Sequence, residues 1–284
     1  MERLEIRAPD GVNIPLTWFP ADSARHALLL LPALGIRSQL YEPLAADLAQ
    51  QGCSVCLLEQ RGQGRSTLRP SYRVNISMSD YLDQDIPASL DWIQKRSGEL
   101  PLLLGGHSLG GHLSTLYAGI EPLRIKGIVH IACSFPYFRD FPTIRSWQIR
   151  FLSLLVSMAR IFPGYFPGAV IGFAGRESST LMNEWRHWAL SGNFDFDPSR
   201  PLAQGVKSYL GPVISIGLAD DDFACEAGIK RALSLFNEHQ VTRLELGHEQ
   251  QGPYLGHFKW ARQPDGVVNA LIEWMNRELS APDP

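Results

Sequence analysis

Eight short apolar runs, separated by segments with helical periodicity, constrain the fold of this 284-residue chain most strongly. Several runs are continuous stretches of Leu, Val or Ile rather than alternating apolar and polar residues, as expected for parallel strands covered by helices on both faces. The pattern predicts an open α/β sheet with right-handed crossovers. The strands are expected at Leu4–Arg7, Asn13–Phe19, Ala27–Leu31, Ser54–Leu58, Leu102–Gly105, Lys126–Ile131, Val213–Gly217 and Thr242–Leu246.

Helices are expected in the segments between these runs, where apolar residues recur every three or four positions. Pro87 lies inside one such segment and should kink or restart its helix. The expected helices are Leu40–Gln50, Tyr81–Arg96, Leu109–Ile120, Glu226–Glu238 and Val267–Leu279.

Residues 134–205 interrupt this alternation. They contain no clear strand, many prolines and half of the chain's aromatic residues. The composition predicts short helices and loops that form a lid over one end of the sheet, with residues 1–133 and 206–284 as the core domain. A helical extension that only enlarges the core is the alternative.

A helical face is expected within this lid, because apolar residues recur there at three- and four-residue steps. The residues are Trp147, Phe151, Leu154, Leu155 and Met158. We expect this face to be buried against the end of the sheet, which leaves other aromatics, such as Trp185 and Trp188, to line a pocket.

The segment Gly106-His107-Ser108-Leu109-Gly110 matches G-x-S-x-G, the pattern of a nucleophile elbow. In such an elbow a tight turn from strand to helix exposes the serine hydroxyl above the sheet, and glycines two residues away let strand and helix approach closely. An apolar strand run precedes this motif and a helical run follows it. Ser108 is therefore the candidate nucleophile.

A serine nucleophile needs a histidine base, and the base needs a carboxylate that orients it. In this arrangement the acid and then the histidine follow the serine, each in a loop after a late strand. Asp221 is the preferred acid, with Asp220 as the alternative. His257 is the preferred base, and His248 in the same loop is the fallback. His107 and His112 flank the serine and are expected to be structural.

An acyl-transfer site also needs two N–H donors for the oxyanion. One is expected to be the backbone N–H of Leu109, which follows the nucleophile. The other should come from the loop after the third strand, where Leu34 is preferred and Ala33 is second.

The composition excludes several other classes of function. Net charge is −3, from 26 basic and 29 acidic residues, so nothing indicates nucleic-acid binding. No apolar run approaches the roughly 18–20 residues of a membrane helix, and the amino terminus does not resemble a signal peptide.

Cys53 and Cys56 form a CxxC inside an apolar strand run, which favours buried thiols over a redox or metal pair. Phosphate-loop and HExxH motifs are absent, so we expect no metal, no cofactor and a cytoplasmic protein.

The sequence resembles the α/β-hydrolase superfamily over nearly its whole length. Beside the elbow, Glu59–Ser66 looks like the D-x-R-G-x-G-x-S turn of many members, with Glu59 in place of Asp. Pro32-Ala33 stands where many relatives have His-Gly. The lid segments Gly164–Gly168 and Asn183–Trp188, with Gly256-His-Phe258, resemble bacterial hydrolases related to the monoglyceride-lipase and serine-aminopeptidase-like branch.

The resemblance implies an α/β-hydrolase fold, with a mostly parallel eight-stranded sheet flanked by helices and a helical lid. Together with Ser108, Asp221 and His257, it predicts a serine hydrolase that cleaves an ester or thioester of a lipophilic small molecule through an acyl-enzyme. An acyltransferase with the same three residues and a non-catalytic binding protein of the same fold are the alternatives. The sequence does not indicate an oligomeric state.

Overall fold

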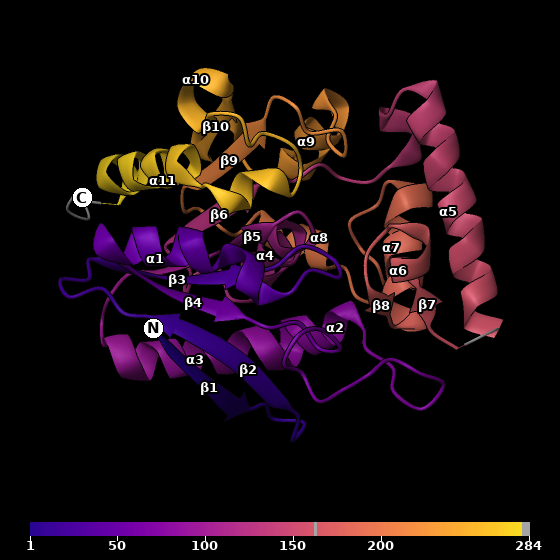
Figure 1. Ribbon diagram of the computed structural model, residues 1–284, viewed down its shortest axis with the longest axis horizontal. Coiled ribbons are helices and arrows are strands. Elements are labelled where there is room, and N and C mark those ends of the chain that lie inside the picture. The colour runs from indigo at the N-terminus through magenta and orange to yellow at the C-terminus, as the bar shows by residue number, and fades with distance from the viewer. Residues whose placement is uncertain (162–163, 280–284) are drawn as a thin grey trace.

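A mostly parallel sheet forms the centre of the molecule in the computed structural model, which describes residues 1–161 and 164–279. The strand order is β1-β2-β4-β3-β5-β6-β9-β10 (Figure 1). β2 pairs antiparallel with β1 and β4, and the later pairs are parallel. The strands are β1 Glu2–Arg7, β2 Asn13–Phe19, β3 His26–Leu31, β4 Cys53–Leu58, β5 Leu102–His107, β6 Gly127–Ile131, β9 Val213–Leu218 and β10 Val241–Leu246.

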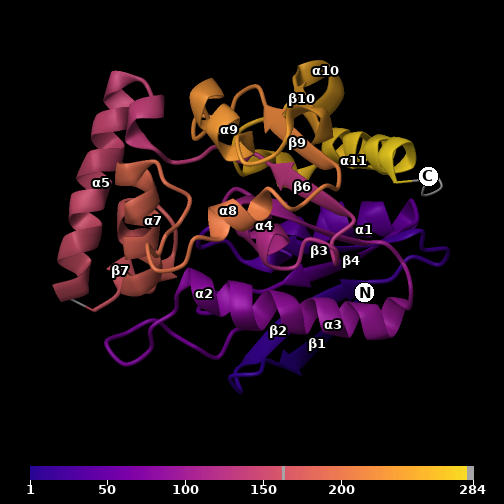
Figure 2. The ribbon, with the colours of Figure 1, turned by 180° about the vertical axis from the view of Figure 1, so that it is seen from behind.

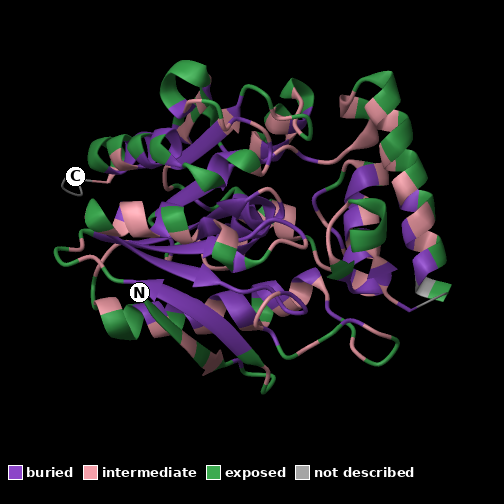
Figure 3. Ribbon diagram, in the orientation of Figure 1, coloured by how far each residue is buried: buried purple, intermediate pink, exposed green. Residues whose placement is uncertain are grey.

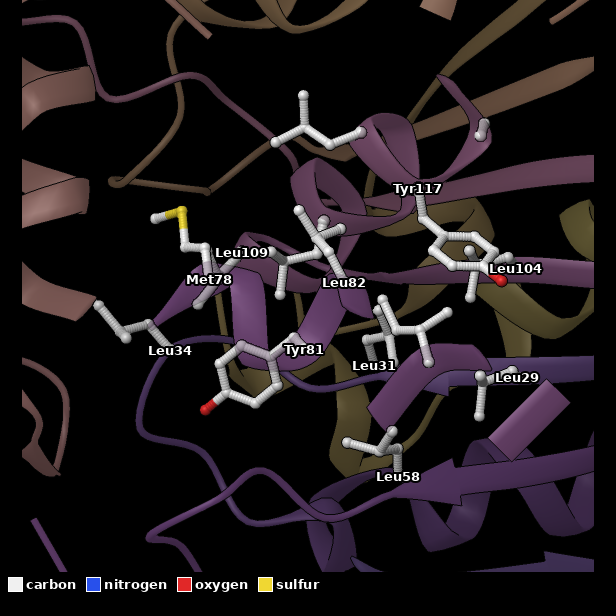
Figure 4. Close-up of a cluster of buried hydrophobic side chains, with 14 of the residues drawn as sticks. Leu29, Leu31, Leu34, Leu58, Met78, Tyr81, Leu82, Leu104, Leu109 and Tyr117 are labelled. Carbon is white, nitrogen blue, oxygen red and sulfur yellow. The ribbon is translucent and has the colours of Figure 1, made fainter. Parts of the chain in front are cut away.

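The eight predicted strands are confirmed, and the reason is visible in β3. Leu29 and Leu31 point into one hydrophobic cluster of the core, and Leu28 and Leu30 point into the other. Figure 4 shows the first two with Leu104 of β5. Because both faces of this strand are buried, its sequence is a continuous apolar run.

Helices cover both faces of the sheet. Side chains of α1 Glu42–Gln50 and α11 Asp265–Glu278 belong to the cluster on one face. Those of α3 Ile86–Ser97 and α4 Leu109–Ile120 belong to the cluster on the other, which faces the viewer in Figure 2. α9, Glu226–Leu233, is shorter than predicted.

Contrary to expectation, the helix does not restart at Pro87, because a π-helical turn runs into α3 without a break and the Ile86 N–H donates to the Tyr81 carbonyl oxygen. This turn spans Tyr81–Asp85, and the proline occupies the first turn of α3. Proline is tolerated there because the first N–H groups of a helix have no intrahelical acceptor.

Most of the chain between β6 and β9 lies beyond one end of the sheet, whereas α8 packs beside α4 (Figure 1). The prediction of short helices is wrong for α5, which has 19 residues. Two strands of two residues each also pair there, antiparallel to one another. The elements are α5 Thr143–Ile161, β7 Phe166–Pro167, α6 Gly168–Ile171, β8 Arg176–Glu177, α7 Ser179–Ser191 and α8 Leu202–Val206.

The predicted burial of one α5 face is also wrong. Trp147, Phe151, Leu154 and Met158 are 56–62% exposed, and only Leu155 of the five predicted residues packs against the core, where it is partly buried. Figure 3 shows much of this helix in the colour of exposed residues. The physical reason is that α5 carries a second apolar stripe, which includes Val156, and this stripe packs against the protein instead.

Cys53 and Cys56 are buried free thiols in β4, as predicted. Burial raises the pKa of both, that of Cys53 to about 12. A thiol that stays protonated is a poor nucleophile and a poor metal ligand. Separately, no helix in the described ranges is long and apolar enough to cross a membrane.

Candidate active site

Ser108 lies at a sharp turn between β5 and α4. Its φ is 52° and its ψ is −113°, in a region where a residue with a side chain is strained by about 1–3 kcal/mol. A Cβ atom on Gly106 would lie 2.5 Å from the carbonyl oxygen of Leu31, and one on Gly110 would lie 2.3 Å from the same atom. The two glycines of the motif therefore allow the end of β3 to pass beside the turn.

Asp221 and His257 form a buried pair next to this turn. Asp221 follows β9 and His257 follows β10. His257 Nδ1 lies 2.8 Å from Asp221 Oδ2 and 3.0 Å from Oδ1, and the two side chains are only 7% and 1% exposed. Because a carboxylate only accepts hydrogen bonds, Nδ1 is the donor and Nε2 is left with a lone pair that can accept a proton.

The alternative residues form a different pair at the surface. Asp220 Oδ2 lies 3.6 Å from His248 Nε2, and these side chains are 60% and 68% exposed. Asp222 is also exposed. Of the three consecutive aspartates, Asp221 is therefore the one that the structure joins to a buried histidine.

A cavity of about 370 Å³ joins these segments. Ser108, Leu109 and His257 line it together with Leu34 of the loop after β3. Ser108 and His257 are both in the described part of the chain, and no hydrogen bond joins their side chains. Such contacts are often long in an empty site and shorten when substrate binds.

The loop after β3 is a turn from Ala33 to Ile36, closed by a hydrogen bond of 3.0 Å from the Ile36 N–H to the Ala33 carbonyl oxygen. The Ala33 N–H donates to Tyr41 Oη at 3.1 Å, so it is already occupied. Among the described residues the Leu34 N–H has no acceptor. Leu109 is the first residue of α4, where the N–H also has no intrahelical acceptor.

Tyr41 and His107 form a buried pair beside the site that the sequence did not indicate. Tyr41 Oη lies 2.8 Å from His107 Nδ1 and accepts the Ala33 N–H, so it ties the loop after β3 to the end of β5. Burial lowers the pKa of His107 well below its usual value, and nearby His257 lowers it further. His107 is thus a neutral structural residue beside the candidate base, as predicted.

His112 lies on the first turns of α4 and lines the cavity. Burial lowers its pKa to about 4, so it is neutral near pH 7. Its ring centroid is 5.8 Å from that of Trp188 and 5.6 Å from that of Phe135. The structural interpretation of His112 therefore holds, and this residue also forms part of the cavity wall.

Glu59, at the start of the D-x-R-G-x-G-x-S-like turn, makes structural hydrogen bonds. Its carboxylate accepts hydrogen bonds from the Ser38 N–H at 2.9 Å and the Ser38 hydroxyl at 3.1 Å. These bonds hold the start of the first helical segment against the turn that follows β4. Metal binding has no comparable support: within residues 1–161 and 164–279 no three His, Cys, Asp or Glu side chains are grouped as metal ligands.

Comparison with known proteins assigns the family. The sequence profile described as serine aminopeptidase, S33, matches residues 22–184, more than half of the chain. The chain belongs to this family. The resemblance to the monoglyceride-lipase and serine-aminopeptidase-like branch is therefore confirmed.

Two curated relatives of this family member match shorter stretches. Mouse monoglyceride lipase is 28% identical over 115 residues, which are 40% of this chain and 37% of the lipase. A serine hydrolase-like protein of Dictyostelium discoideum is 25% identical over 131 residues, 45% of this chain and 34% of that protein. The chain thus matches little more than a third of the length of each relative.

Solved structures match this S33 family member over nearly its whole length. The α/β hydrolase GrgF from Penicillium sp. sh18 has a TM-score of 0.68 at 16% identity and covers 99% of both chains. Est1E from Butyrivibrio proteoclasticus, solved with ferulic acid, has a TM-score of 0.68 at 14% identity and covers 98% of this chain and 100% of its own. The predicted α/β-hydrolase fold is confirmed.

Proposed function

We propose that this chain is a serine hydrolase that cleaves an ester or thioester of a lipophilic small molecule through an acyl-enzyme. The observation that carries the proposal is the buried hydrogen bond from His257 Nδ1 to Asp221, at a cavity that Ser108 also lines. Membership of the S33 family supports a hydrolytic activity.

In this mechanism Ser108 Oγ attacks the substrate carbonyl carbon while His257 Nε2 takes the hydroxyl proton. Asp221 holds the imidazole in the required tautomer and stabilises the imidazolium. The N–H groups of Leu34 and Leu109 donate to the negatively charged oxygen of the tetrahedral intermediate. The bond to the leaving oxygen or sulfur then breaks, and His257 returns the proton to that atom. Water attacks the acyl-enzyme by the same route, which releases the acid and restores Ser108.

Residues 134–205 act as the lid in this proposal. Ile149 and Leu152 of α5 and Phe173, Trp185 and Trp188 contribute to the cavity that contains the nucleophile. A lining of this kind binds an acyl or aryl group by excluding it from water.

The test is a panel of aryl esters and acyl thioesters from acetyl to octanoyl. Burial of each added methylene is worth about 0.8 kcal/mol, so kcat/KM should rise about fourfold per methylene until the cavity is full. Ser108→Ala should remove the activity. A flat chain-length profile would contradict the lipophilic substrate, and normal turnover by Ser108→Ala would overturn the whole proposal. Added alcohol acceptors in the same assay separate hydrolysis from acyl transfer.

A further inference from the structure

Helix α5 has two apolar faces, and only one of them is packed against the protein. Ile149 and Leu152 line the cavity, and Val156 is buried in the core. On the opposite side, six large apolar residues follow each other at steps of three and four, each more than half exposed. They are Ile144, Trp147, Phe151, Leu154, Met158 and Ile161, with exposures of 56–79%. We call these six residues the outer face of α5.

An apolar face of this length needs a covering partner, because scattered single exposed residues are ordinary but a continuous apolar patch marks an interaction site. Two partners fit a helical stripe: the same helix of a second copy, or a lipid surface. The charges around the outer face indicate which of these two partners is favoured.

The segment around the outer face is cationic. From Phe141 to Arg176 the sequence contains four arginines and no aspartate or glutamate, although the whole chain has more acidic than basic residues. The acidic residues at its two ends are not available to balance it. Asp140 Oδ1 accepts a hydrogen bond from Arg231 Nη2 at 2.9 Å, and Glu177 is buried.

We propose that the outer face of α5 docks on an anionic lipid surface. The apolar side chains would enter the interface, and Arg150 would contact the anionic headgroups. Arg150 lies beside this face, with its guanidinium 4.7 Å from the Trp147 ring centroid. A second copy is disfavoured, because two α5 helices packed together would bring like charges close without an acidic partner in the segment.

Docking in this way would place the cavity on the far side of α5 from the lipid, one helix diameter (roughly 10–12 Å) away. Arg145 and Gln148 lie near the start of α5 and line the cavity, and each directly follows an exposed residue of the outer face, Ile144 and Trp147. The docking itself does not require catalysis, so it can be tested whether or not the proposed reaction is correct.

The experiment measures co-sedimentation of the full chain with vesicles of phosphatidylglycerol and phosphatidylcholine, and with vesicles of phosphatidylcholine alone. We expect binding to the anionic vesicles that weakens as salt is added. Phe151→Ser with Leu154→Ser should reduce the binding constant by at least about tenfold. Arg150→Gln should reduce it by about fivefold.

The matched controls are Leu123→Ser and Leu210→Ser, which change apolar residues that are 90% and 77% exposed outside α5. They should bind vesicles like the unchanged protein. All variants should hydrolyse a soluble short-chain ester at the unchanged rate, because none of the substituted residues lines the cavity.

Two results would overturn the proposal. One is the absence of binding to anionic vesicles, or binding that Phe151→Ser with Leu154→Ser leaves intact. The other is a dimer of the unchanged protein, seen by light scattering, that this double variant converts to a monomer. In that case a second copy covers the outer face.

Discussion

The central sheet and the chain between β6 and β9 are held together in different ways. In the sheet, strands such as β5 and β6 are buried on both faces by apolar side chains. The segment from α5 to α8 also joins the hydrophobic core, but one buried carboxylate, Glu177, and one partly buried carboxylate, Glu184, help to attach it. Glu177 accepts hydrogen bonds from Gln63 Nε2 at 2.7 Å and from the Gly175 N–H at 3.0 Å. Glu184 accepts one from the Met78 N–H at 2.7 Å.

The two regions therefore differ in what a substitution is expected to change. The sheet holds the elbow at the end of β5 and Asp221 just after β9, His257 lies in the loop after β10, and the attached segment completes the cavity. We therefore expect changes at the strand ends to affect chemistry, and changes in the attached segment to affect stability, pH dependence and substrate range. The predictions below test that division.

The largest effect is expected at Asp221. Asp221→Asn favours the wrong histidine tautomer and should lower kcat by about 10⁴. Asp220→Asn changes an exposed carboxylate and should lower kcat by less than about tenfold. Steady-state kinetics of the two variants on one ester substrate measure this. Equal, mild losses would mean that the orienting acid lies elsewhere.

The next effect compares two tryptophans of the attached segment. Trp188 is 0% exposed, and its Nε1 donates to the Phe194 carbonyl oxygen at 2.7 Å. Trp188→Ala should lower the free energy of unfolding by about 3–5 kcal/mol. Trp147→Ala, on the outer face of α5, should change it by less than about 0.5 kcal/mol. Urea unfolding measures both. A severe loss with Trp147→Ala would mean that this face is packed.

A smaller effect is expected where the two regions touch at Gly35. Its φ is +73°, and a Cβ atom there would lie 2.2 Å from the Gly175 backbone nitrogen. Gly35→Ala should displace the adjacent Leu34 N–H and lower kcat by about 10². Gly98→Ala is the matched control, since Gly98 has a φ of +66° and nothing within 4 Å of its Cβ position. If the two variants have the same kcat, the contact with Gly175 does not support the loop.

The last effect is a pH dependence of stability. Burial raises the pKa of Glu177 and of Glu184 from 4.5 to about 7. Between pH 4.5 and about pH 7 the folded state therefore binds more protons than the unfolded state. Each group makes the free energy of unfolding fall as pH rises through this window, by at most about 1.4 kcal/mol per pH unit.

Glu177→Gln and Glu184→Gln should remove this fall, so each variant gains stability relative to the unchanged protein between about pH 5 and about pH 8. Glu226→Gln is the control. Its ion pair with Arg243 lowers the pKa of Glu226 to about 2, so its contribution is constant over that range. Urea unfolding at both pH values measures the differences. The same gain for all three variants would show that Glu177 and Glu184 do not cause the pH dependence of the free energy of unfolding.

The sequence predicts the sheet well because a strand that is buried on both faces has a continuous run of apolar residues. It predicts Ser108 because the turn around this serine needs glycine at positions 106 and 110, where the backbone of β3 passes close by. It could not separate Asp221 from Asp220, since consecutive residues share a loop and only the fold brings one of them to His257. The choice between Leu34 and Ala33 depends on the contact of Ala33 with Tyr41, which no local pattern reveals.

The error on α5 has a related cause. Both of its faces are apolar at helical spacing, so periodicity predicts a helix but cannot tell which face the protein covers. The stripe with Trp147 and Phe151 has the larger side chains, and it was expected to be the buried one. The structure instead packs the stripe that contains Leu152 and Val156 inward.

The most direct test of the proposed triad is covalent labelling with a fluorophosphonate, followed by mass spectrometry of the digested protein. The account predicts one adduct, on Ser108, which is absent in Ser108→Ala and forms far more slowly in Asp221→Asn but not in Asp220→Asn. An adduct on another residue, or an active protein that is never labelled at Ser108, would contradict it.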